Sequence, residues 1–198
     1  MKKISVVLSS LLLFSTISNA KSLSLTIDPS ASELIWEGKK IAGQHHGHLK
    51  LKSGKITVVN NAITGGNFEI DMKSLTNEDI SDAVYKEKLI GHLKSDDFFS
   101  VEKHPTAIFT ITKVEKLHNA NDATHTVTGN LKIKGIAKSL SFPAKIKIDG
   151  KSFEASGKAT IDRTKYDIKY RSKNFFKDLG DKVIDDHFVV NLKLLSKK

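Results

Sequence analysis

The chain has 198 residues, contains no cysteine and carries a formal net charge of +10 at pH 7. The absence of cysteine excludes disulfide bonds, thiolate metal sites and thiol catalysis, so the fold must be held together by its core. A chain of this length buries roughly 70% of its unfolded surface, which is enough for one self-sufficient domain. Because no Pro-, Gly- or Ser-rich linker and no internal repeat interrupts the sequence, we predict a single domain over residues 21–198.

Residues 1–20 have the pattern of a secretory signal peptide. Lys2 and Lys3 form a basic start, residues 6–17 are apolar apart from small hydroxyl residues, and Ala20 ends a run of small residues before an expected cut. A membrane anchor would need about 20 apolar residues. We therefore expect a soluble exported protein, most simply periplasmic or secreted, whose net charge falls from +10 to +8 with the loss of Lys2 and Lys3.

From Leu34 onward, apolar and polar residues alternate with period two, which is typical of strands with one wetted face. Turn residues at 53–54, 60–61, 119–122 and 149–150 predict chain reversals. About eight or nine antiparallel strands must hide their apolar faces together, either in a closed barrel or in a sandwich. The strand count alone does not choose between these two architectures.

Residues 80–93 break the alternation with an apolar spacing near 3.6, which predicts a short amphipathic helix that Asn77 could cap. Phe98 and Phe99 follow it. Adjacent side chains of one strand cannot both face inward. We therefore expect this segment to be a plug or lid with apolar groups on two sides.

Small residues at Ala155, Gly157 and Ala159 occupy successive inward positions of one predicted strand. They would leave a void, and a void is costly in a core that could collapse. Either a ligand fills this space, or large residues from facing strands or a strand bend fill it. Both readings stay open on these residues alone.

The best candidates for a metal site are His45, His46 and His48. His46 and His48 would share one face and could chelate zinc as a pair, but Lys50 and Lys52 share that face too, which indicates a solvated surface. No acidic third ligand is close in sequence, and residues 185–187 could supply one only through the fold. We find no nucleophile motif, and the adjacent Asp96 and Asp97 point apart. We predict no catalytic residue, no metal and no cofactor.

The charge pattern argues against nucleic acid as a partner. Only Arg163 and Arg171 are arginine, and the lysines are spread over nearly every predicted strand. Such a surface is compatible with weak contact with an anionic membrane. Arg163 and Arg171 could hold a ligand head group, or pin the fold through Asp162, Asp167 or Asp185, and we favour the pin. Residues 174–177, with a second phenylalanine pair, could line one end of a cavity.

Five runs carry a resemblance to a known family: residues 36–39 (WEGK), 65–72 (GGNFEIDM), 91–99 (GHLKSDDFF), 129–136 (GNLKIKGI) and 161–166 (IDRTKY). In this order they resemble the YceI-like family of bacterial lipocalin-like, polyisoprenoid-binding proteins. The resemblance implies an all-β fold, namely an extended eight-stranded antiparallel lipocalin-like barrel with a short helix inserted mid-chain, which holds a lipid and performs no chemistry.

We therefore expect a binding protein that sequesters or carries a polyisoprenoid, isoprenoid quinone or fatty amide. Its rivals are a histidine-based metal-binding protein or hydrolase, and a self-filled barrel with a structural or stress role. A homodimer is left open. The residues expected to bind the ligand are Trp36, Phe68, Ile70, Met72, Phe98, Phe99, Phe109, Leu131, Ile133, Phe142 and Phe188.

Overall fold

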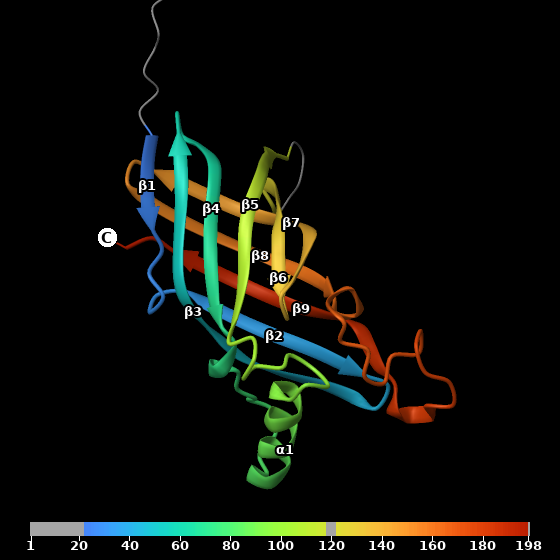
Figure 1. Ribbon diagram of the computed structural model, residues 1–198. Helices are drawn as coiled ribbons and strands as arrows, with labels where there is room; N and C mark the ends of the chain where they lie inside the picture. The colour runs from blue at the N-terminus through green and yellow to red at the C-terminus, as the bar shows by residue number, and fades with distance from the viewer. Residues whose placement is uncertain (1–21, 118–121, 198) are drawn as a thin grey trace, which may run out of the picture.

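The computed structural model describes residues 22–117 and 122–197, most of which lie in strands (Figure 1). The expected signal peptide and most of the expected turn at 119–122 lie outside the described residues. The strands are β1 (Ser22–Thr26), β2 (Glu33–Lys40), β3 (Gly43–Val59), β4 (Ala62–Asp71), β5 (Thr106–Lys116), β6 (His125–Ile133), β7 (Ile136–Asp149), β8 (Ser152–Asp162) and β9 (Ile184–Leu195). The helices are α1 (Ala83–Lys94) and three short 3-10 turns, η1 (Met72–Ser74), η2 (Arg163–Tyr166) and η3 (Gly180–Lys182).

Eight of the nine strands close an antiparallel barrel, which confirms the predicted fold class. Their order is β3-β2-β9-β8-β7-β6-β5-β4, and β4 pairs back onto β3. Strand β1 pairs with the far end of β3, beyond the part that pairs with β2, so β1 and β2 together cover one long neighbour. In the described part of the chain, no helix is long and apolar enough to cross a bilayer.

The alternation along the strands sorts side chains between the barrel interior and solvent, as predicted. In β8, Ala155 and Ala159 are buried while Lys158 and Thr160 are exposed. The inward residues of all the barrel strands join one hydrophobic cluster that also takes in η1 and α1. The period of two therefore fixes which residues line the interior.

Strand β3 does not turn at Ser53 and Gly54, so that prediction was wrong. The strand runs for 17 residues, and its register with β4 shifts between Leu51 and Ser53, which marks a β-bulge. The inward positions change parity there, from Leu51 to Gly54 and then Ile56. A glycine inside a strand marks a bulge as readily as a turn.

The other reversals follow the turn residues more closely. Asn60 and Asn61 have φ angles of 50° and 62° and join β3 to β4, and Gly150, with φ of 55°, joins β7 to β8. Both were predicted. Lys134 and Gly135, with φ angles of 50° and 78°, join β6 to β7. No reversal was predicted at this pair.

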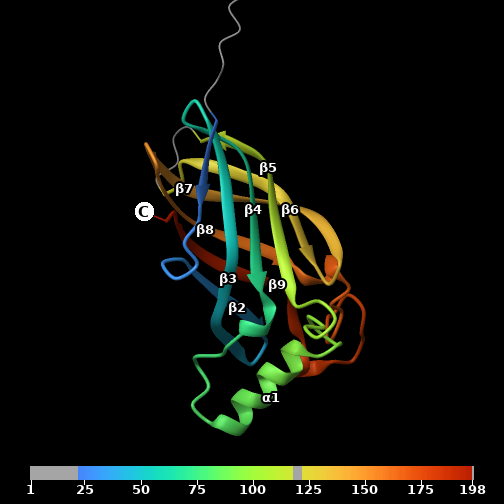
Figure 2. The same cartoon turned by 60° about the vertical axis from the view of Figure 1, so that its left-hand side comes forward.

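Helix α1 begins at Ala83, three residues later than predicted, and Asp82 caps it by accepting from the backbone N–H groups of Val84 and Tyr85. Asn77 is buried instead and donates to the carbonyl of His46. Val84 and Tyr85 are exposed, whereas Leu93 is buried. The helix therefore presents a narrower apolar face than the spacing suggested, and Figure 2 shows it lying across one end of the barrel.

The segment between η1 and α1 packs directly on β3 at Gly47. The backbone N–H of Thr76 donates to the carbonyl of His48, and the backbone N–H of His48 donates to the hydroxyl of Thr76. A Cβ at position 47 would lie 2.7 Å from the carbonyl carbon of Thr76. Because that obstacle is backbone, we expect Gly47→Ala to lower the free energy of unfolding by about 1–3 kcal/mol. Urea denaturation measures the change. Gly65→Ala, where a Cβ meets open space, is the matched control, and equal losses in both variants would refute the packing argument.

Candidate functional site: an apolar cavity inside the barrel

The barrel encloses a cavity of about 470 Å³. All eight barrel strands contribute to its lining, together with Met72 of η1 and Leu89 and Leu93 of α1. Most of the lining side chains are aliphatic or aromatic. Such a lining can hold an apolar molecule by excluding water, and it offers few polar groups for chemistry.

All of the predicted ligand residues line this cavity: Trp36, Phe68, Ile70, Met72, Phe98, Phe99, Phe109, Leu131, Ile133, Phe142 and Phe188. Their contact with a ligand stays a prediction. Sequence reasoning missed Val190 and Leu192, which share the parity of Phe188 and could have been found by it, and the helix residues Leu89 and Leu93.

The space beside the small residues of β8 is partly empty and partly filled by a neighbouring strand, so both possibilities left open by the sequence are observed. Ala155 and Ala159 line the cavity. At Gly157, by contrast, a Cβ would lie 3.4 Å from Cδ2 of Phe142, so a large residue of the neighbouring strand fills that space. The void that the sequence predicted therefore exists on either side of Gly157 and not over it.

An aromatic plug, consisting of His92, Phe98, Phe99, Tyr170 and Phe188, lies on the cavity lining. The Phe98 and Phe99 ring centroids are 6.2 Å apart, and Phe99 meets Phe188 at 5.9 Å. The ring of His92 lies 5.1 Å from Phe98 and 4.5 Å from Tyr170. Both adjacent phenylalanines thus find apolar surroundings, as expected for a plug, because they lie in a turn after α1 and not in a strand.

The loop after the plug is held by polar contacts of its own. Asp96 accepts hydrogen bonds from the hydroxyl of Ser100 and, at 2.6 Å, from the ammonium of Lys103. Its carboxylate therefore ties the turn together, which agrees with a structural role and not with acid–base work.

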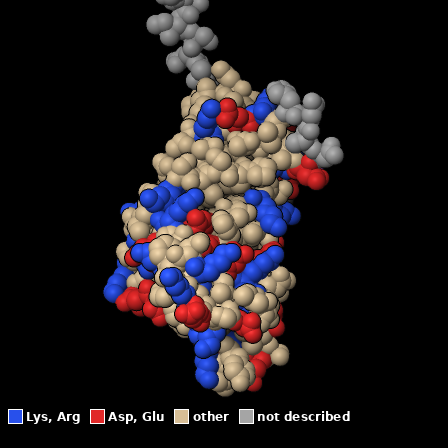
Figure 3. Space-filling model, turned by 90° about the vertical axis from the view of Figure 1, so that its right-hand side faces the viewer, with Lys and Arg blue, Asp and Glu red and all other residues tan. Residues whose placement is uncertain are grey.

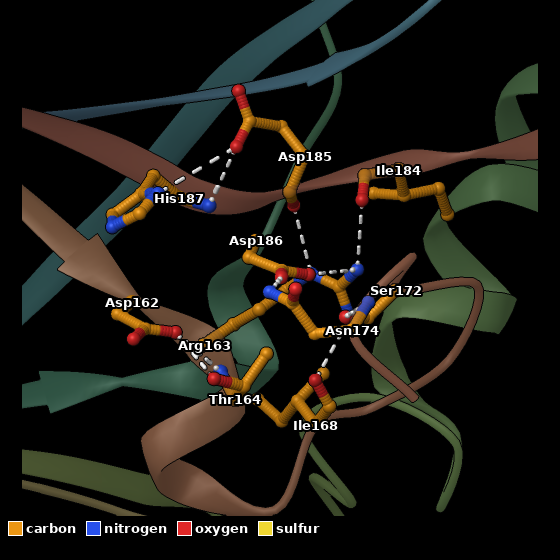
Figure 4. A network of polar contacts seen from close by, with 10 residues as sticks. All are labelled: Asp162, Arg163, Thr164, Ile168, Ser172, Asn174, Ile184, Asp185, Asp186 and His187. Atoms are coloured by element: carbon orange, nitrogen blue, oxygen red, sulfur yellow. Dashed lines mark hydrogen bonds and ion pairs between the residues drawn. The ribbon is translucent and has the colours of Figure 1, made fainter. Parts of the chain in front are cut away.

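Arg163 is 3% exposed and pins three segments of chain together (Figure 4). Its guanidinium donates to the carbonyls of Asp185 at 2.9 Å, Ile168 at 2.8 Å and Ile184 at 3.0 Å, and it lies 3.3 Å from the carboxylate of Asp186. Burial lowers the pKa of Arg163, while Asp186 opposes that shift. The favoured structural role is observed, but the ion-pair partner is Asp186 and not Asp162, Asp167 or Asp185.

Asp186 is itself held in place, because its second oxygen accepts from the side-chain amide of Asn174 at 2.6 Å. Phe175 and Phe176, next along the chain, are about half exposed and do not line the cavity. The expectation that this pair lines one end of the cavity was therefore wrong. Asn174 is exposed but donates to the buried Asp186, and the two rings beside it stay half exposed.

Asp79 lies between two of the candidate metal-binding histidines. It is 2.7 Å from Nδ1 of His45 and accepts from the backbone N–H of His46 at 2.9 Å. No acid is close to these histidines in sequence, and the fold brings one to them from the loop before α1, Asp79, which the sequence analysis did not name. Within residues 22–117 and 122–197, no cluster of three or more His, Asp or Glu side chains is arranged to hold a metal ion.

The Asp79 carboxylate should make stability depend on pH. Burial raises the pKa of Asp79, but hydrogen bonds from His46, His45 and Asn77 outweigh it and leave a pKa of about 2 in place of 3.8. A lowered folded-state pKa adds stability above the unfolded pKa, and this stability is lost as the pH falls towards about 2. Because Asp79 is an exposed residue and solvent screens its contacts, we expect Asp79→Asn to cost only about 1 kcal/mol near neutral pH and to flatten the decline between about pH 4 and pH 2. Urea denaturation across this range measures both, and parallel declines would contradict the assignment.

Comparison with known proteins identifies the family and several relatives of the chain. Residues 25–195 match the model of a family described as YceI-like domain. UPF0312 protein plu2095 of Photorhabdus laumondii is 33% identical over 115 residues, and Protein YceI of Salmonella arizonae is 30% identical over 115 residues. Each alignment covers 54% of this chain and 53% of the relative, so the chain spans about half the length of these curated relatives.

Solved structures share the fold at low identity. BcnA of Burkholderia cenocepacia aligns with a TM-score of 0.65 at 20% identity, over 86% of this chain and 99% of BcnA. A polyisoprenoid-binding domain from Saccharophagus degradans, implicated in plant cell wall breakdown, aligns with a TM-score of 0.54 at 13% identity, over 90% and 99%. At these identities the likeness extends to the barrel alone.

Proposed function

The chain belongs to the YceI-like family, and on that premise we propose that it binds a long hydrophobic molecule of polyisoprenoid type inside its barrel. The observation that carries the proposal is the closed barrel whose cavity is lined by apolar side chains from every barrel strand. The ligand class is supported by the polyisoprenoid-binding domain of Saccharophagus degradans, which has the same fold. An isoprenoid quinone, a polyprenol and a fatty amide all have tails suited to such a lining.

The hydrophobic effect supplies the binding energy. Each Å² of apolar surface removed from water is worth about 25 cal/mol, so even a modest tail gains several kcal/mol. The role is storage or carriage, and no covalent step is part of the proposal. Export to the periplasm is also part of it, supported by the basic start and apolar run of residues 1–20.

Trp36 offers a direct test, because it is the single tryptophan and lies on the cavity lining. Its indole N–H donates to the carbonyl of Thr76 at 2.8 Å, which fixes the ring in place. We expect geranylgeraniol, added to delipidated protein, to change the Trp36 emission saturably. A protein that shows no saturable change, and that also fails to take up a fluorescent hydrophobic probe, would contradict binding in the cavity.

A further inference from the structure

The charged residues that line the cavity gather at one end of it. Four cations, Lys39, Lys40, Arg171 and Lys182, line the cavity with two acids, Asp181 and Asp185. Lys39 and Lys40 lie at the end of β2, Arg171 in the loop before η3, Asp181 and Lys182 in η3, and Asp185 at the start of β9. Apart from the buried Arg163, the remaining lining is apolar or carries histidine. We call the four cations the mouth cluster.

Backbone pairing shows that the mouth cluster is contiguous. Lys40 pairs with Ile184 across β2 and β9, and the N–H of Ile184 donates to the carbonyl of Arg171 at 3.0 Å. The N–H of Ile41 donates to the carbonyl of Val183, next to Lys182, at 3.3 Å. In Figure 1 this is the region where the β2 arrow ends beside the start of β9.

The positive charge of the mouth cluster is not neutralised by ion pairs among the described residues. Among the described residues, none of its four side chains forms an ion pair, whereas six other lysines and Arg163 do. Of the two acids, Asp185 accepts from the backbone N–H of His187 at 2.9 Å. Figure 3 shows this side of the molecule, where Lys and Arg side chains alternate with acids over the lower half. At the cavity itself cations outnumber acids, so the mouth attracts negative charge.

We propose that the mouth cluster binds the anionic head group, a phosphate or a carboxylate, of the molecule whose chain occupies the cavity. The inference rests on the proposed function, because an apolar chain in the barrel places its head at this end. Arginine offers a planar fork to such a group, and lysine offers a mobile point charge. Hydrogen bonds between charged partners are stronger than neutral ones, and the apolar lining beside them weakens solvent screening.

Two ligands with the same tail and different head groups separate the contribution of the head group to affinity from that of the tail. Dodecyl phosphate and dodecanol are titrated into the delipidated full-length protein, and their Kd values are measured by displacement of a fluorescent hydrophobic probe. We expect dodecyl phosphate to bind about tenfold more tightly than dodecanol at low salt. That preference should shrink as the ionic strength rises to about 0.5 M.

Variants locate the effect. Lys40→Gln with Lys182→Gln should reduce the Kd ratio of the two ligands to near one. Lys145→Gln with Lys147→Gln, on the exposed face of β7, removes the same charge far from the mouth and should keep the ratio. Both pairs replace exposed side chains, and circular dichroism confirms that the variants fold.

Each of the remaining outcomes of this experiment rejects either the head-group site or the proposed function. Equal affinity for the two ligands, or an unchanged ratio in the Lys40→Gln, Lys182→Gln variant, rejects the head-group site and leaves the proposed function standing. Failure of both ligands to displace the probe rejects the proposed function itself. Inorganic phosphate that binds as tightly as dodecyl phosphate makes the mouth cluster a site for free phosphate and rejects the head-group assignment.

Discussion

Replacing Arg163 by methionine is expected to lower the free energy of unfolding by about 3–5 kcal/mol, because it leaves a buried charge without its partner. The guanidinium joins η2, the loop at Ile168 and the start of β9. Methionine fills a similar volume but donates nothing, so three carbonyls lose the guanidinium and Asp186 keeps only the hydrogen bond from Asn174. Urea denaturation followed by circular dichroism measures the loss.

Lys165→Met is the matched control on the same turn. Lys165 is exposed and lies 3.9 Å from Asp162, and surface pairs of this kind contribute at most about 1 kcal/mol. Arg163→Lys should recover little stability, because one ammonium cannot reach acceptors that lie in several directions. A loss in Arg163→Met no larger than in Lys165→Met would show that the network does not hold the barrel.

Filling the cavity should abolish ligand retention. Ala159 is buried on β8 and lines the cavity, so Ala159→Phe places a ring where the ligand chain would lie. Leu131→Arg, on β6 two strands away, should act by adding a charge to the lining, which a hydrophobic chain cannot satisfy. Lipid extraction and mass measurement of the purified variants show whether the ligand is retained.

Lys158→Phe provides the control, since it adds the same ring one residue away on the outer face. It should retain ligand at the level of the unchanged protein. Retention in a folded Ala159→Phe variant, or in a folded Leu131→Arg variant, would refute the assignment of these inward faces to the ligand.

The local pattern of the sequence was sufficient to predict the barrel wall. Alternation placed Phe68, Leu131 and Phe142 on the inside, since neighbouring positions of a strand must point to opposite faces. The same rule indicated that Phe98 and Phe99 could not both face inward from one strand. These predictions depend only on residues close together in the chain.

The predictions that were wrong depend instead on residues that lie far apart in the chain. Whether Ser53 and Gly54 form a turn or a bulge depends on pairing with β4, and the partner of Arg163 lies 23 residues away at Asp186. Asp79 reaches His45 across 34 residues. Such contacts depend on how the chain closes, so the sequence analysis named Asp162, Asp167 and Asp185 as possible partners of Arg163 and missed Asp186, the neighbour of Asp185.

Native mass spectrometry of the protein purified from a bacterial periplasm, before and after solvent extraction, tests the lipid-binding cavity most directly. We expect a stoichiometric extra mass that extraction removes and that belongs to an isoprenoid-type lipid. A bare chain mass would instead indicate a self-filled barrel, and a mass raised only by a metal ion would indicate a histidine site. Either result would contradict the role of the cavity as a lipid site.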